Sequence, residues 1–400
     1  LMALTKLTQN LIDGTIVTSV NGSSGAVTLE TGTDWISTIQ TSNFTAVAGK
    51  GYFVNTTSAE ITVTLPAGAV GNEVIIQDYA GTFATNKVIF ASNGSEKIQG
   101  STDDYKNSTN NSTITLVYQD ATKGWTADNI ETNAVPVEVY YLVVAGGGSG
   151  GANSNSGGGG AGGYRTNFGG TGVSISVATN YLVTIGAGGA GAAPQAAPGN
   201  GNNGINSVFN NITSTGGGRG SGQGGSAASG GSGGGGAYDT GGASGNAGNY
   251  TPVEGYAGGA GVSAGSYPGG GGGGASEAGN TDGNGHGGDG VSNSINGAST
   301  IYAGGGSGGV SGGNSIIPGG DGGGGAGSNN TATSQAGTAN TGGGSGGGSG
   351  SYGSGNGGSG IVILRYPNTL TISGLSGTTT TVGSDKVTTF TSGTGNIQFN

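Results

Sequence analysis

The sequence has no cysteine, one histidine and one methionine, and only 8% of its 400 residues are charged. Without cysteine there are no disulfides and no thiolate metal ligands. A single histidine leaves little material for Ser-His-Asp or Cys-His catalysis. No apolar run approaches the ~18 residues of a membrane-spanning helix. The net charge of −10 offers no basic cluster for nucleic acid or anionic lipid. We therefore expect no nucleic-acid partner, no membrane insertion, no cofactor, no metal and no enzymatic activity.

Glycine is what the sequence has in excess. The chain contains 100 glycines, of which 83 lie in residues 141–360. A stretch so poor in side chains cannot share one conventional hydrophobic core with the rest of the chain. Collagen is excluded, because there is no strict Gly-X-Y period and there are only 8 prolines. By composition alone, a flexible low-complexity linker is as good an interpretation as an ordered domain.

Outside the glycine region the patterning is typical of β-structure. The segment Ile61-Thr62-Val63-Thr64-Leu65 alternates apolar and polar residues and is stopped by Pro66. Short strands spaced by turn-rich pieces predict a small sandwich or barrel. The sequence predicts an all-β chain with four parts: an attachment or oligomerisation segment at 1–30, a β domain at 31–135, a glycine-rich domain at 136–367 and a C-terminal β segment at 368–400.

Two features favour an ordered glycine region. Strong strand patterns at 137–144 and 361–367 enclose it, and tyrosines interrupt its runs, which a solvated spacer does not need. Glycine in the polyproline II conformation has three residues per turn and no internal hydrogen bonds, so its backbone must bond to neighbours. Packed runs of this kind, called polyglycine II, would satisfy those groups. Because ordering glycine is costly, we expect the flanking strands, and neighbouring chains, to support the lattice.

Two motifs in this region resemble ligand-binding motifs, but their sequence context does not predict a ligand site. A G-x-G-x-x-G match at 186–191 follows an expected strand, but Ala192-Ala193-Pro194 comes next and cannot begin the helix that a dinucleotide needs. His286 lies between Asp282 and Asp289 in a glycine-rich loop, and such a set is more often solvated than bound to a cation.

Tyrosine-rich interruptions are the candidate binding residues. Tyrosine offers rigid contact area and a hydroxyl at low entropic cost, which suits adaptable loops. The same rings could instead cover the edge of the glycine lattice, and the two interpretations stay open. The receptor-contact candidates are Tyr238, Asp239, Asn249, Tyr250, Glu254, Tyr256 and Tyr267.

Several segments resemble those of bacteriophage tail fibres, particularly marine ones. The opening Met2-Ala3-Leu4-Thr5-Lys6-Leu7 and segment 19–29 resemble fibre N-termini, and 73–83 with Gly124-Trp125 resembles a β domain that recurs there. The region from 141–148, through 162–165, to 358–366 is similar to the glycine-rich adhesin domain of phage fibres. That resemblance implies packed polyglycine II helices with receptor-reading loops at the distal tip.

Resemblance and composition together predict a viral tail-fibre protein that binds a host surface receptor without chemistry. The receptor would be a polysaccharide or an outer-membrane protein, and the N-terminus would join other tail proteins of the virion. We expect an intertwined homotrimer. Two alternatives stay open. One is a structural subunit of a glycine-rich extracellular or cell-surface filament. The other is a fibre-borne depolymerase, and the sequence argues against it because it shows no clustered acidic residues that would flank a substrate groove.

Overall fold

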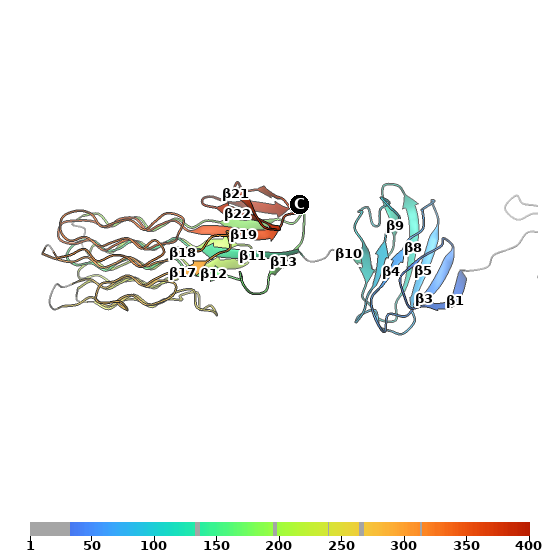
Figure 1. The fold of residues 1–400 in the computed structure, drawn as a ribbon, viewed down its shortest axis with the longest axis horizontal. Helices are drawn as coiled ribbons and strands as arrows, with labels where there is room; N and C mark the ends of the chain where they lie inside the picture. Colours follow the sequence, from blue (N-terminus) through green and yellow to red (C-terminus); the bar gives the residue numbers. More distant parts are fainter. Residues whose placement is uncertain (1–32, 133–136, 195–197, 239, 264–267, 313) are drawn as a thin grey trace, which may run out of the picture. The chain divides into compact units, whose positions relative to one another are not determined.

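The structure, a computed structural model, describes residues 33–132, 137–194, 198–238, 240–263, 268–312 and 314–400 (Figure 1). These residues form strands, turns and extended runs with no α-helix, which confirms the predicted all-β fold. None of the described elements is a helix that could span a bilayer. The chain divides into unit 1, residues 1–135, and unit 2, residues 136–400. The attachment segment predicted at 1–30 lies outside the described residues.

The described part of unit 1 is a pair of five-stranded sheets. The first sheet contains, in spatial order, β1 (Asp34–Gln40), β3 (Lys50–Val54), β5 (Glu73–Asp78), β8 (Thr113–Asp120) and β9 (Gly124–Thr126). The second contains β10 (Glu131–Thr132), β7 (Tyr105–Asn107), β6 (Val88–Ala91), β4 (Ile61–Thr64) and β2 (Phe44–Thr45).

The first six strands of unit 1 alternate between the two sheets, so neighbours within a sheet run parallel. Period-two patterning then sends one side of each strand inward, as in β4, where Ile61 and Val63 are buried while Thr62 and Thr64 are only half-buried. The resulting core includes Phe83, Phe90 and Trp125, all fully buried.

The described residues of unit 2 form two larger sheets and a hairpin. The six-stranded sheet contains β12 (Tyr164–Thr166), β11 (Val137–Val144), β19 (Ile361–Pro367), β22 (Asp385–Phe390) and β21 (Thr378–Val382), with β13 (Val173–Ile175) also paired to β11. The five-stranded sheet contains β16 (Ile212–Ser214), β15 (Ser207–Phe209), β14 (Tyr181–Thr184), β23 (Thr394–Phe399) and β20 (Ile372–Gly374). The hairpin is β17 (Val291–Asn293) with β18 (Thr300–Tyr302).

The strands that enclose the glycine region pair with each other. β11 and β19 are antiparallel, with Val144 opposite Ile361, so the glycine region leaves and re-enters the sheet at one place. Residues 368–400 complete both sheets, because β22 pairs with β19 and β23 pairs with β14. Phe390 and Phe399 from this segment are fully buried in the core formed with β11, β14 and β19.

The glycine runs extend away from these strands and bond to one another. Successive N–H groups of run 157–161 donate at 2.8–3.0 Å to three neighbouring runs in rotation, namely 216–222, 269–274 and 342–349. Its carbonyls accept from 145–151, 230–236 and 304–309. A rotation of period three is that of a helix with three residues per turn, the polyglycine II arrangement. These runs are therefore ordered and bonded within one chain, and the flexible-linker interpretation is wrong for them.

Packing in this lattice leaves almost no room for side chains. A Cβ added to Gly159 would fall against the carbonyl oxygen of Gly148 on the neighbouring run. A few interior serines fit where they replace a backbone bond. The hydroxyl of Ser345 accepts a bond from the N–H of Gly150 at 2.9 Å and donates to the carbonyl of Gly355 at 2.6 Å.

Candidate functional site

Turns join the glycine runs at the end away from the strands, and these turns are the candidate contact surface. Figure 1 shows the labelled strands of unit 2 gathered at one end of the runs and turns at the other. We call the latter the outer turns, with described residues 153–155, 198–200, 223–226, 238, 314–317, 329–332 and 349–352. They contact one another: Tyr238 N–H donates to the Asn155 carbonyl at 3.0 Å, and Asn329 Nδ2 donates to the Asn314 carbonyl at 3.2 Å.

The outer turns differ in sequence while the runs that carry them are alike. Asparagines make several of the reversals, because they tolerate a left-handed backbone: φ is 74° at Asn153 and 70° at Asn330. Ile316 is an exposed apolar side chain in such a turn, with 51% of its surface accessible. The lattice thus presents varied, mostly small and polar side chains from a fixed base.

The structure divides the receptor-contact candidates between the two ends of the runs. Tyr238 lies at an outer turn, whereas Asn249 and Tyr250 lie at the strand end, close to β12. Tyr256 lies in the run that leads outward again, and the residue is 41% exposed. Asp239 and Tyr267 fall outside the described residues.

Glu254 lies at the strand end and is fully buried. Its carboxylate accepts hydrogen bonds from the N–H groups of Thr215 at 2.9 Å and Gly248 at 3.2 Å. Its own carbonyl accepts from the N–H of Tyr164, the first residue of β12. A carboxylate so placed ties a loop to a sheet edge and does not face a large partner.

We expect Glu254→Gln to lower the free energy of unfolding by about 2 kcal/mol, because one of the two buried N–H groups would face an amide NH₂. Chemical denaturation followed by circular dichroism measures this. Glu277→Gln, which alters a less buried carboxylate, is the matched control and should change stability by less than about 0.5 kcal/mol. Equal effects of the two substitutions would contradict the structural role of Glu254.

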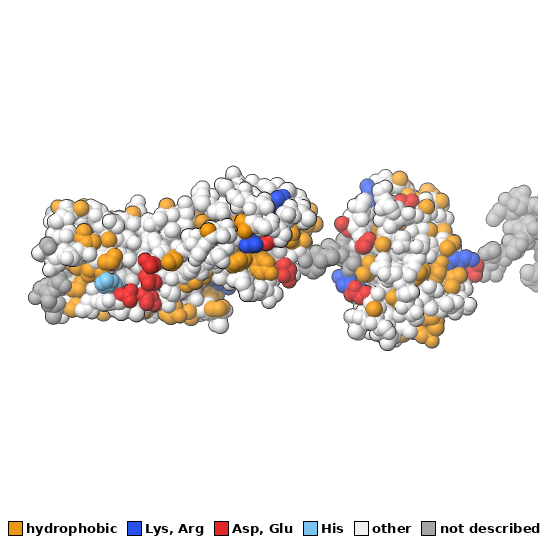
Figure 2. Space-filling view, viewed as in Figure 1, with side chains coloured by type: hydrophobic (Ala, Val, Ile, Leu, Met, Phe, Trp, Pro, Cys, Tyr) orange, Lys and Arg blue, Asp and Glu red, His pale blue; other side chains and the backbone are white. Residues whose placement is uncertain are grey.

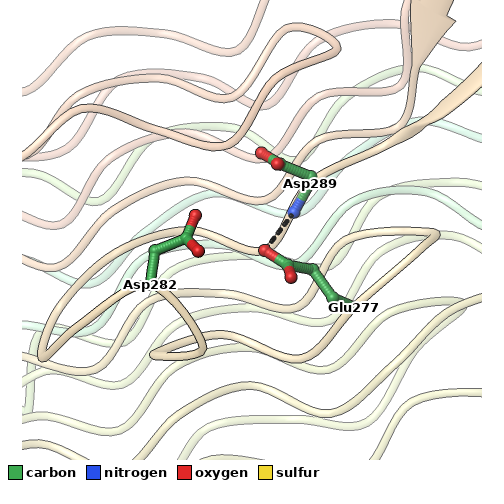
Figure 3. A group of neighbouring side chains, drawn as sticks. All are labelled: Glu277, Asp282 and Asp289. Carbon is green, nitrogen blue, oxygen red and sulfur yellow. Dashed lines mark hydrogen bonds between the residues drawn. The ribbon is translucent and has the colours of Figure 1, made fainter.

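Three carboxylates converge elsewhere in the lattice. One oxygen each of Glu277, Asp282 and Asp289 lie within 4.8 Å of one another (Figure 3). Glu277 Oε1 also accepts from the N–H of Asp289 at 3.2 Å. Figure 2 shows acidic side chains gathered beside the only histidine, His286, which is not a member of this group.

The sequence hypothesis named Asp282, His286 and Asp289 and missed Glu277. Glu277 enters because residues 276–278 form the turn at which the chain reverses beside Asp289, as the bond from Ser276 N–H to the Asp289 carbonyl shows. No sequence motif encodes that reversal. Oxygen donors suit a hard cation, but three half-buried or exposed acids are also common without one.

Comparison with known proteins identifies the glycine region. A family model described as a glycine-rich domain matches residues 120–367, well over half of the chain. The matched segment begins at the end of β8 in unit 1 and ends with β19 in unit 2. No curated protein matches the chain.

Proposed function

The chain belongs to the glycine-rich domain family, and from that premise we propose that it is a bacteriophage tail-fibre protein that binds a host cell-surface receptor through its outer turns. In this proposal unit 2 is the adhesin, and residues 1–30 join other tail proteins of the virion. Binding requires no chemistry. The working form is a homotrimer, in which identical tips engage together and gain avidity without any one strong contact.

One observation carries the proposal: all but small side chains are largely excluded from the lattice, and larger ones are carried at its turns. Run 157–161 is bonded to neighbouring runs on all sides, so the base is rigid. The outer turns carry side chains that do not fit between the packed runs, including the exposed Ile316. A rigid scaffold with varied loops at one end is a common design for recognition, because binding then does not have to order the loops.

The polar character of this surface fits a hydrated receptor. Asparagine, serine and threonine dominate the described outer turns, with few charges. Such side chains supply adaptable hydrogen bonds, as in antibody loops. A surface polysaccharide and the loops of an outer-membrane protein both offer matching groups.

Changing exposed outer-turn residues should weaken cell binding. We expect the double variant Ile316→Ser with Thr331→Gly to bind at least about tenfold less than the unchanged chain, since lost contacts at a central patch typically cost about 1.4 kcal/mol or more. Fluorescently labelled protein on a panel of bacterial strains, measured by flow cytometry, gives the readout.

Leu182→Ser is the matched control. Leu182 is 42% exposed on β14, at the strand end, so its change alters a comparable apolar surface away from the outer turns. Its binding should equal that of the unchanged chain. Binding to no strain in a broad panel, or equal loss in both variants, would refute the proposal.

A further inference from the structure

A small cavity lies at the strand end of unit 2, away from the outer turns. It has a volume of about 260 Å³ and lies between the edge strand β12 and the loop 251–253. The bond from Tyr164 N–H to the Glu254 carbonyl, at 2.9 Å, fixes that loop against the strand. The buried Glu254 carboxylate anchors the loop from the other side. The walls are therefore held in place by the fold.

Among the residues that the structure describes, Arg165 is the only charged one that lines this cavity. Its guanidinium carbon lies 4.0 Å from the centre of the Tyr250 ring, and its Nη1 donates to the Thr213 carbonyl at 3.0 Å. The ion pairs among the described residues do not include Arg165. A ring and a carbonyl thus fix the guanidinium, while no carboxylate among the described residues pairs with its charge and its Nε and Nη2 groups remain able to donate.

Tyr164 and Thr166 offer further hydrogen-bond donors from the opposite face and the open edge of β12, since successive side chains of a strand point to opposite faces. The Tyr164 hydroxyl accepts a bond from Asn293 Nδ2 at 2.7 Å, which leaves its own proton free to donate. Burial raises the pKa of Tyr164 above its ordinary value, so the phenol keeps that proton at neutral pH. Since Tyr164 N–H points away from β11, the alternation of an antiparallel ladder places the N–H of Thr166 on the same open edge.

The remaining walls are apolar and hydroxylated. Pro252, Val253 and Val291 provide apolar surface, and Thr251 provides a hydroxyl. None of the described lining residues is acidic. The volume is below the 300–1,000 Å³ or so that is typical of drug-sized ligands, which limits the occupant to about one ring.

We propose that this cavity binds the carboxylate-bearing ring of an acidic sugar, a uronate. Arg165 holds the carboxylate, the donors on β12 meet ring oxygens, and Pro252 and Val253 pack against the C–H face of the ring. The net charge of −10 would repel an anion in general, so recognition depends on this one fixed cation. The inference goes beyond the proposed function, because the cavity is separate from the outer turns and would be occupied whatever those turns bind.

The test is titration of the full chain with D-glucuronate, and with D-glucose as the neutral counterpart, followed by NMR or calorimetry. We expect saturable glucuronate binding in the millimolar range, weakened by salt, and at least about tenfold weaker binding of glucose. Arg165→Gln should lose the preference for glucuronate. Arg219→Gln, at the other arginine of the glycine region, should retain it.

Val253→Trp is a second variant that tests the cavity independently, in case Arg165→Gln loses binding through a folding defect. Val253 is 47% exposed, so a larger ring there should obstruct the cavity without disturbing Arg165 or the core, and should also abolish binding. Equal binding of glucuronate and glucose by the unchanged chain, or retention of the preference in Arg165→Gln, would overturn the proposal. Cell binding through the outer turns would survive either result.

Discussion

Gly159→Ala is expected to destabilise unit 2 by at least about 3 kcal/mol, at the upper end of the cost of overpacking. The new methyl group would lie against the carbonyl oxygen of Gly148. Gly148 is itself held in place, because its N–H donates to Gly160 and its carbonyl accepts from Ser345. Gly159 itself donates to Ser345 and accepts from Gly306, at 2.8 and 2.9 Å. Neither run can withdraw without losing such bonds, so the strain cannot relax locally.

Gly241→Ala is the matched control, because a Cβ there meets nothing within 4 Å. Alanine at a compatible position reduces the entropy of the unfolded chain, so we expect no loss and a gain of up to about 1 kcal/mol. Thermal and denaturant unfolding of both variants give the comparison. A cost for Gly159→Ala that is no larger than that for Gly241→Ala would show that the runs are not packed as described.

Truncation after Pro367 is expected to abolish cooperative folding of unit 2, although the family match ends there. Removal of 368–400 strips β22 from β19 and β23 from β14. It also removes Phe390, Ile397 and Phe399, all fully buried. Losing each of these large side chains costs about 2–5 kcal/mol. The combined loss is therefore as large as the ~5–15 kcal/mol by which a typical domain is stable.

A chain that begins at residue 136 is the control, because unit 1 has its own core. It should unfold in one cooperative transition, as seen by calorimetry and by dispersion of amide NMR signals. Should the chain ending at Pro367 give the same transition, the C-terminal strands would be dispensable and the core assigned to them would be wrong.

Strands with strong local patterns were predictable from the sequence. The predicted segment 137–144 is β11, and the prediction at 61–65 differs from β4 by one residue. Apolar alternation and proline stops act locally, so they mark such strands. Strands without that signal, such as β15 (Ser207–Phe209) in a polar setting, depend on their sheet partners and were not predicted.

The neighbours of each glycine run could not be predicted. One glycine is chemically the same as another, so nothing in run 157–161 specifies 216–222 as a partner in preference to any other run. The order is set by turn lengths and by the strands from which the runs start. Those are tertiary constraints, and sequence spacing alone does not reveal them.

The receptor-contact candidates lie at both ends of the lattice, and their spacing in the sequence did not reveal this. A run of about seven residues spans roughly 20 Å in this conformation, so side chains one run apart in sequence lie at opposite ends of the lattice. Tyr238 and Glu254 are separated by such an excursion. Arg165, by contrast, had no distinguishing sequence signal, because its ring partner and its cavity come from the distant segment 250–253.

The rotation of bonds along each glycine run has a mechanical consequence. A β-sheet is bonded only within its plane, so stacked sheets can shear past each other by sliding side chains. Around run 157–161, backbone bonds cross every plane that contains its axis. Tension or torque applied at a turn is therefore shared at once among all surrounding segments, and no layer offers an easy direction of slip.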